Sequence, residues 1–232
     1  MRLALLAALA ALAAGALASP ASATRECDGL DVCIRVPGPW IAVPAAGAAR
    51  ESTVVYRLSC PRGSIAGGLD AVRADRALDV VFLGALGSPV NPGITTKRHV
   101  VFVATSASRR VTAFRPLLGC IPTSGGGGRR TTSVRAAVVQ SRIVRRVATF
   151  RVTGATRSGA VRCGRNERLL SFSYAVAFRT RTTPAASVLS GVTVRLRRSG
   201  DRVVFSARRT AGVPQRAHPE VQVHALCGTG GR

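Results

Sequence analysis

The chain has 232 residues, and its 34 basic and 10 acidic residues give a formal net charge of +24. Its aromatic residues, seven Phe, two Tyr and one Trp, are too few for the stacking surfaces of nucleic-acid readers, so the composition argues against sequence-specific nucleic-acid recognition. A positive charge of this size instead favours salt-dependent attraction to polyanions such as anionic polysaccharide or other envelope polymers.

The first 23 residues have the features of a secretory signal peptide. Arg2 precedes an Ala/Leu-rich stretch that is too short for a comfortable membrane span, and Ala21-Ser22-Ala23 forms an Ala-x-Ala cleavage site. We therefore expect cleavage after Ala23 and a mature chain that is secreted or associated with the cell envelope. An uncleaved membrane anchor is the less favoured alternative. We expect no integral membrane span after cleavage, because Arg, Gly or Pro interrupts every later apolar run.

Six cysteines follow the predicted cleavage site, and an even number in an exported chain favours disulfides over free thiols. Six cysteines allow about fifteen pairings. The intervals within successive pairs are 6, 60 and 64 residues, which suggests sequential pairing into one local clip and two long loops. In the chain-entropy model each long loop would contribute roughly 4 kcal/mol of stability. The cysteines are Cys27, Cys33, Cys60, Cys120, Cys163 and Cys227.

Residues 24–121 are expected to form an N-terminal β domain. Three prolines between residues 36 and 44 exclude a helix there and favour an extended, polyproline-like or edge-strand path. Residues 69–80 fit either a short helix or a strand with a bulge. The Gly/Pro-rich residues 84–96 are predicted to form a long loop, a type of segment that often carries function. The strands expected in this half are residues 53–59, 78–83, 99–105 and 111–114.

The clearest break in composition is the Gly-rich segment 122–133, which is expected to be a linker or surface loop before a C-terminal β domain, residues 134–232. Within residues 191–208, apolar and polar side chains alternate on both sides of a Ser-Gly-Asp turn, which predicts a β-hairpin. The period of two places Arg195 and Arg197 on one face as a basic stripe. Further strands are expected at residues 134–139, 143–152 and 169–178.

The two long cysteine loops share an outline. In each, a strand enters the first cysteine, several short strands follow, and an alternating strand leads into the second cysteine. We therefore expect an all-β fold of tandem disulfide-stapled β-sandwich-like units related by a degenerate internal duplication. The alternative is that any two β segments ending in cysteine look alike.

Residues 53–121 carry a Cys60-Pro61-Arg62-Gly63 turn, a Gly67-Gly68 pair and a closing strand that ends at Cys120. In these features the first half resembles a largely uncharacterised group of exported β proteins from high-GC bacteria. The resemblance implies export and a β fold with a Cys–Cys staple, and it implies no activity. The second half departs from the pattern, because Cys163 is followed by neither the Pro nor the Gly pair.

The sequence shows no recognisable catalytic or metal-binding motif. The histidine bases available to an enzyme are His99, His218 and His224, and no Gly-x-Ser-x-Gly elbow accompanies them. Three aspartates between residues 70 and 79 could suit calcium, although pairing with arginines or turn capping is favoured. We therefore predict no catalytic residue, no metal and no cofactor. The alternative from another functional class is a secreted hydrolase with an unrecognised site, for which His99 near these aspartates would be the most plausible starting residue.

The leading hypothesis is a secreted, non-enzymatic binding or structural module that associates with anionic envelope or extracellular polymer through arginine-rich faces. A protein-binding or inhibitor domain that uses the loop 84–96 is a further alternative. For individual arginines, the competing role is that of solvated surface. The candidate binding residues are Arg142, Arg145, Arg146, Arg195, Arg197, Asn91 and Trp40.

Overall fold

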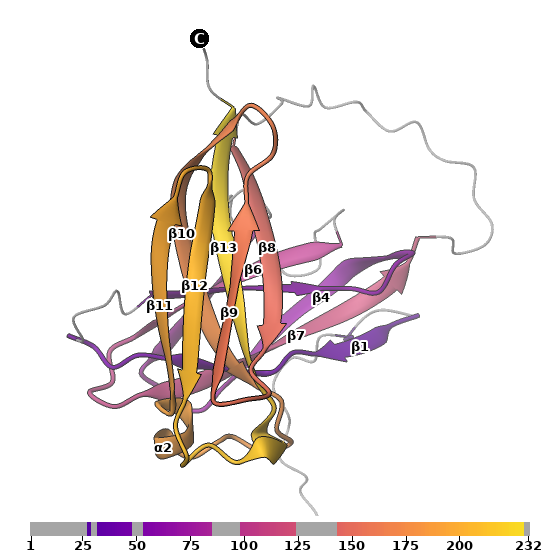
Figure 1. The fold of residues 1–232 in the computed structure, drawn as a ribbon. Helices are drawn as coiled ribbons and strands as arrows, with labels where there is room; N and C mark the ends of the chain where they lie inside the picture. Colours follow the sequence, from indigo (N-terminus) through magenta and orange to yellow (C-terminus); the bar gives the residue numbers. More distant parts are fainter. Residues whose placement is uncertain (1–26, 29–31, 48–52, 85–97, 124–142, 230–232) are drawn as a thin grey trace, which may run out of the picture.

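The computed structural model describes residues 27–28, 32–47, 53–84, 98–123 and 143–229, and it is all-β, as the sequence predicts (Figure 1). The predicted signal peptide, the expected strand 134–139, and most of the predicted linker and of the loop 84–96 lie outside these residues. In the described part, the helix α2 (Ala186–Leu189) and a 3-10 turn at Gln215–Ala217 are short, and no helix has the length and apolar character needed to cross a membrane.

One large antiparallel sheet runs through both halves of the chain. Its seven strands are β1 (Ile34–Pro37), β2 (Trp40–Val43), β4 (Ser64–Arg73), β7 (Thr112–Pro122), β8 (Ile143–Arg151), β10 (Glu167–Phe178) and β13 (Pro219–Thr229). β7 pairs with β4 along one edge and with β1 and β2 along the other. β2 also pairs with β10, β10 with β13, and β13 with β8. The short strand β2 therefore joins the N-terminal half of the sheet to the C-terminal half.

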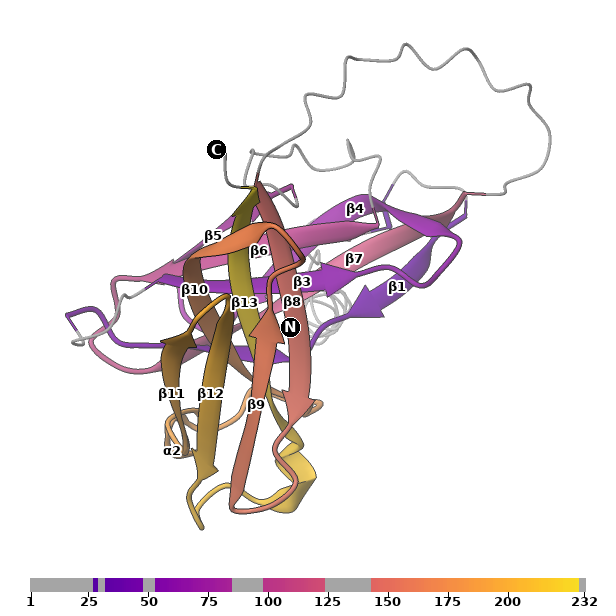
Figure 2. The same cartoon turned by 45° about the horizontal axis from the view of Figure 1, so that its top comes forward.

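Two three-stranded sheets complete the fold. One has the order β3 (Thr53–Ser59), β6 (His99–Ser106), β5 (Leu78–Leu83), and the other has the order β11 (Val192–Ser199), β12 (Arg202–Arg209), β9 (Thr156–Arg162). The sheet of β9, β11 and β12 packs on the C-terminal part of the large sheet, and the sheet of β3, β5 and β6 packs on its N-terminal part and also contacts β10 and β13. The buried side chains form two apolar cores, one built mainly from the C-terminal half and one mainly from the N-terminal half. The strands of the N-terminal half run across those of the C-terminal half (Figure 1, Figure 2).

The two halves repeat one pairing pattern. Strands β3 to β7 correspond in order to β9 to β13, with β6 and β12 at the centre of the small sheets and the pairs β4–β7 and β10–β13 in the large one. In each half, the residue six positions after the first cysteine, Ala66 or Leu169, pairs with the second cysteine, and a bulge follows directly. This is the arrangement that the predicted internal duplication requires.

The disulfides confirm the predicted sequential pairing. The second cysteine of each long loop lies within β7 or β13 and has no exposed surface. The sequence separations are 6, 60 and 64 residues for Cys27–Cys33, Cys60–Cys120 and Cys163–Cys227.

Most expected strands are present, and β11 and β12 confirm the predicted hairpin. The helix considered for residues 69–80 is wrong: these residues form the end of β4, a turn and the start of β5, because β7 offers β4 a partner along its length. The extended path expected for residues 36–44 is confirmed by β1 and β2, but β2 lies inside the large sheet and is not an edge strand. It can do so because Pro39 and Pro44, which cannot donate a backbone hydrogen bond, lie just outside it. β9 was not expected.

Candidate anion-binding face

The strands β11, β12 and β9 lie side by side with one face buried and one exposed (Figure 1). Val194, Val203 and Phe205 point into the C-terminal core, and each is at most 1% exposed. Gly159 on β9 makes room for the ring of Phe205, since a Cβ there would lie 2.7 Å from a ring carbon. Burial of one face by alternate residues fixes the register and turns the intervening polar residues to solvent.

The solvent-exposed face of this sheet is rich in arginine. The register aligns Arg195 with Ser206 and Ser158, and it places Arg202 directly opposite Arg162. Small side chains such as these serines separate the guanidinium groups. We refer to this surface as the arginine face, and its arginines are Arg162, Arg195, Arg197, Arg202 and Arg208, all exposed.

The arginine face contains no counter-charge of its own. The three strands carry eight arginines and no aspartate or glutamate, and Asp201 lies in the turn that joins β11 to β12. Within the described residues, none of the five outward guanidinium groups forms an ion pair or a side-chain hydrogen bond. Like charges directly opposite each other are destabilising, as for Arg162 and Arg202. A bound anion would offset that repulsion.

The dimensions of the arginine face suit a chain of charges better than a single small anion. Neighbouring strands lie about 4.8 Å apart and alternate residues about 6.7 Å apart along a strand, so the five arginines cover about 10 Å by 20 Å. A guanidinium group offers several donors in a fixed plane and binds phosphate, sulfate or carboxylate oxygens in pairs. An extended polyanion could meet several of these groups at once.

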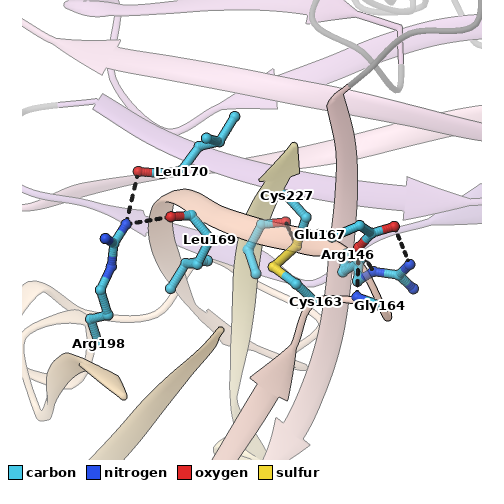
Figure 3. Close-up of a disulfide and its surroundings, with 9 residues drawn as sticks. Arg146, Cys163, Gly164, Glu167, Leu169, Leu170, Arg198 and Cys227 are labelled. Atoms are coloured by element: carbon cyan, nitrogen blue, oxygen red, sulfur yellow. Dashed lines mark hydrogen bonds and ion pairs between the residues drawn. A yellow bond between two sulfur atoms is a disulfide. The ribbon is translucent and has the colours of Figure 1, made fainter. Parts of the chain in front are cut away.

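Two arginines outside the arginine face, Arg146 and Arg198, form hydrogen bonds within the protein. On β8, Arg146 donates two hydrogen bonds to Glu167, at 2.6 and 2.8 Å (Figure 3). Together with the Gly164 N–H, this contact lowers the pKa of Glu167 to about 2. The Arg198 guanidinium bonds the carbonyl oxygens of Leu169 and Leu170 at the β10 bulge (Figure 3). Both arginines hold the surroundings of the Cys163–Cys227 disulfide in place.

The remaining predicted binding residues do not gather at the arginine face. Trp40 is 5% exposed and packs in the C-terminal core. Arg145 is half-buried and pairs with Leu226 of β13, on the face of the large sheet turned away from β12. Asn91 and Arg142 lie outside the described residues.

One serine–histidine contact bears on the hydrolase alternative. Ser59 Oγ lies 2.7 Å from His99 Nδ1, across the β3–β6 pair. Within the described residues, no carboxylate bonds the other ring nitrogen of His99. Burial, Arg57 and Arg98 all lower the pKa of His99, which opposes the imidazolium that a general base forms. The hydrolase alternative stays a prediction, without an orienting acid among the described residues.

Two of the three aspartates considered for calcium accept hydrogen bonds from nearby backbone. The Asp70 carboxylate accepts a hydrogen bond from the Ala71 N–H, and Asp75 accepts one from the Ala77 N–H. Among the described residues, the grouping of potential metal ligands is Cys163, Cys227 and Glu167. The two sulfurs are bonded to each other and are not thiolates, so they are poor ligands.

An apolar cleft of about 470 Å³ opens where β10 meets β3 and β11. No charged side chain lines it, so it is not part of the arginine face. Its lining includes Val54, Val111, Phe172, Tyr174, Leu189 and Leu196.

Sequence reasoning placed Arg195 and Arg197 on one face but did not place Arg162, Arg202 and Arg208 beside them. Arg202 and Arg208 could have been found by writing out the register of the predicted hairpin, which places them on the same face as Arg195. Arg162 could not, because β9 has few β-branched residues and its pairing with β12 spans a long stretch of chain. The face therefore becomes visible only when three strands are assembled.

Comparison with models of known protein families, with curated proteins and with solved structures finds no match to this chain. The function must therefore be argued from the geometry and the charge of the site itself.

Proposed function

We propose that this chain is an exported, non-enzymatic module that binds an anionic envelope or extracellular polymer on its arginine face. The observation that carries the proposal is five outward arginines on three adjacent strands that contain no carboxylate. Such a surface attracts polyanions over a distance set by the Debye length, about 8 Å at physiological salt.

The scaffold behind the face supports this role. Phe205 and its neighbours are buried beneath the strands, and the Cys163–Cys227 disulfide ties the end of β9 to β13. A rigid sheet presents its arginines without further ordering, which lowers the entropic cost of binding. Disulfides persist in oxidising compartments, so three of them fit an extracellular protein.

Retention of the mature chain on an immobilised anionic polymer tests the proposal. We expect retention to weaken as salt is raised, and we expect the variant Arg195→Gln with Arg197→Gln to elute at lower salt than the wild type. The matched control is Arg109→Gln with Arg110→Gln, which removes the same charge from an exposed turn of the N-terminal half. Retention that does not fall with salt, or equal elution of the two variants, would contradict the proposal.

A further inference from the structure

A second cluster of positive charge lies at the junction of the two halves, away from the arginine face. It consists of Arg57, Arg98, His99, Arg145 and His224, which we call the junction cluster. Arg57 and Ser59 share one face of β3, and Ser59 pairs with His99. On the large sheet, Arg145 of β8 pairs with Leu226, two residues beyond His224 on β13. Strands from both halves therefore contribute to the cluster.

Gln222 holds the two sets of residues together. Its Oε1 accepts a hydrogen bond from the Arg57 backbone N–H at 2.6 Å, and its Nε2 donates to the Arg57 carbonyl oxygen at 3.1 Å. These backbone partners fix the orientation of the amide, because an N–H must meet the oxygen and a carbonyl must meet the NH₂ group. His224 Nε2 lies 2.8 Å from the same Oε1, so this nitrogen must be the donor. Nδ1 of the neutral imidazole is then an acceptor.

Three buried polar atoms of the junction cluster lack partners, whereas Arg98 Nε donates to the Cys60 carbonyl oxygen and His99 Nδ1 contacts Ser59 Oγ. Arg57 Nε, Arg145 Nε and His224 Nδ1 are buried and have no hydrogen bond, and His224 is 1% exposed. Within the described residues, no carboxylate pairs with Arg57, Arg98 or Arg145. A buried polar atom without a partner costs about 1–3 kcal/mol, more when the group is charged. The fold therefore keeps an unfavourable arrangement that a ligand would relieve.

The charges also act on one another. Burial, then Arg145 and Arg98, lower the pKa of Arg57. Burial, then Arg145 and Arg57, lower the pKa of His224 to about 3, which keeps its imidazole neutral near pH 7. Gln222 contacts both the Arg57 backbone and His224, and Arg145 lies on the same face of the large sheet as His224, so Arg57, Arg145 and His224 lie on one side of this sheet.

We propose that the junction cluster is a binding site for a phosphate group that retains one proton, with inorganic hydrogen phosphate as the simplest example. Its negative oxygens would accept hydrogen bonds from Arg57, Arg98 and Arg145, and its P–O–H would donate to His224 Nδ1. Sulfate carries the same charge at neutral pH and has no O–H to donate, so it meets only part of this requirement. The site is separate from the arginine face and does not depend on it.

Thermal unfolding of the mature chain provides the test, because a ligand that binds only the folded state raises the midpoint in a saturable way. Inorganic phosphate, sulfate and glycerol 1-phosphate would each be titrated at millimolar concentration, against chloride of equal ionic strength. We expect phosphate to raise the midpoint more than sulfate. We expect Arg145→Gln to weaken the apparent phosphate affinity about tenfold or more. The control Arg110→Gln, which removes one charge from an exposed turn of the N-terminal half, should leave the affinity unchanged.

The quantity compared between variants is the change in unfolding midpoint on addition of phosphate. A variant that is less stable without phosphate can therefore still be compared with the wild type. In the wild type, the imidazole ¹⁵N resonance of His224 should also move on addition of phosphate. A response to glycerol 1-phosphate equal to that for phosphate would identify a terminal phosphate of a larger molecule as the source, and a response to phosphate alone would identify the free anion. An equal effect of sulfate, no effect of phosphate, or an unchanged affinity in Arg145→Gln would overturn the proposal.

Discussion

The number of arginines that touch a polyanion can be measured from the salt dependence of binding. Each contact releases counterions, and the logarithm of the binding constant falls with the logarithm of salt concentration by about 0.7 per contact for a flexible chain such as a single-stranded nucleic acid. Five contacts on the arginine face give a slope of about −3.5, and removal of Arg195 and Arg197 should reduce it to about −2.1. Between 50 and 200 mM salt, affinity should then fall roughly 130-fold for the wild type and roughly 18-fold for the variant.

Titration of the mature chain with sodium polyphosphate of narrow length distribution, followed by calorimetry at four salt concentrations, measures both slopes. The variant Arg109→Gln with Arg110→Gln loses the same charge, so it reports the effect of net charge alone. Its slope should stay near that of the wild type. If this control reduced the slope as much as the Arg195/Arg197 variant does, binding would depend on overall charge and not on a defined arginine face.

Three further predictions concern the scaffold. Replacing Cys163 and Cys227 with serine should lower the free energy of unfolding by about 4 kcal/mol in chemical denaturation, because their bond closes a loop of 64 residues; a loss below about 1 kcal/mol would argue against that account. The pKa of His224 lies well below its ordinary 6.5, so unfolding between about pH 6.5 and pH 3 takes up a proton, and the free energy of unfolding should fall as the pH drops through this range. Urea titrations across pH measure this dependence, and His224→Gln should reduce it. Gly159→Ala should cost about 1–3 kcal/mol through overlap with the ring of Phe205, and an unchanged thermal midpoint would show that the core relaxes freely.

The parts of the fold that depend on local pattern could be predicted from the sequence. The alternation at residues 192–196 gave the hairpin and the shared face of Arg195 and Arg197, because a buried face imposes a period of two on any strand. The disulfide pairing followed from the near-equal spacing of the cysteines in the two halves. In both cases a feature of the sequence reports directly on one structural requirement.

The parts that depend on distant pairing could not be predicted. The residues of β9, Thr156–Arg162, have little β propensity, and they form a strand because β12 offers a free edge beside them. The junction cluster combines Arg57 with Arg145 and His224, and no short-range signal connects these positions. Burial of Trp40 likewise follows from the insertion of β2 into the large sheet, which its flanking prolines obscured.

The two halves differ in the residues that follow their first cysteines, but the backbone adopts the same conformation there. The turn after each first cysteine needs a positive φ at its third position, and Gly63 (φ 78°) and Asn166 (φ 63°) both provide it, since Asn tolerates the left-handed region better than most residues. A backbone hydrogen bond of 3.2 Å closes the turn in each half, from the Ser64 N–H to the Pro61 carbonyl oxygen and from the Glu167 N–H to that of Gly164. The bulge at the seventh position after each first cysteine, by contrast, appears only in the strand pairing.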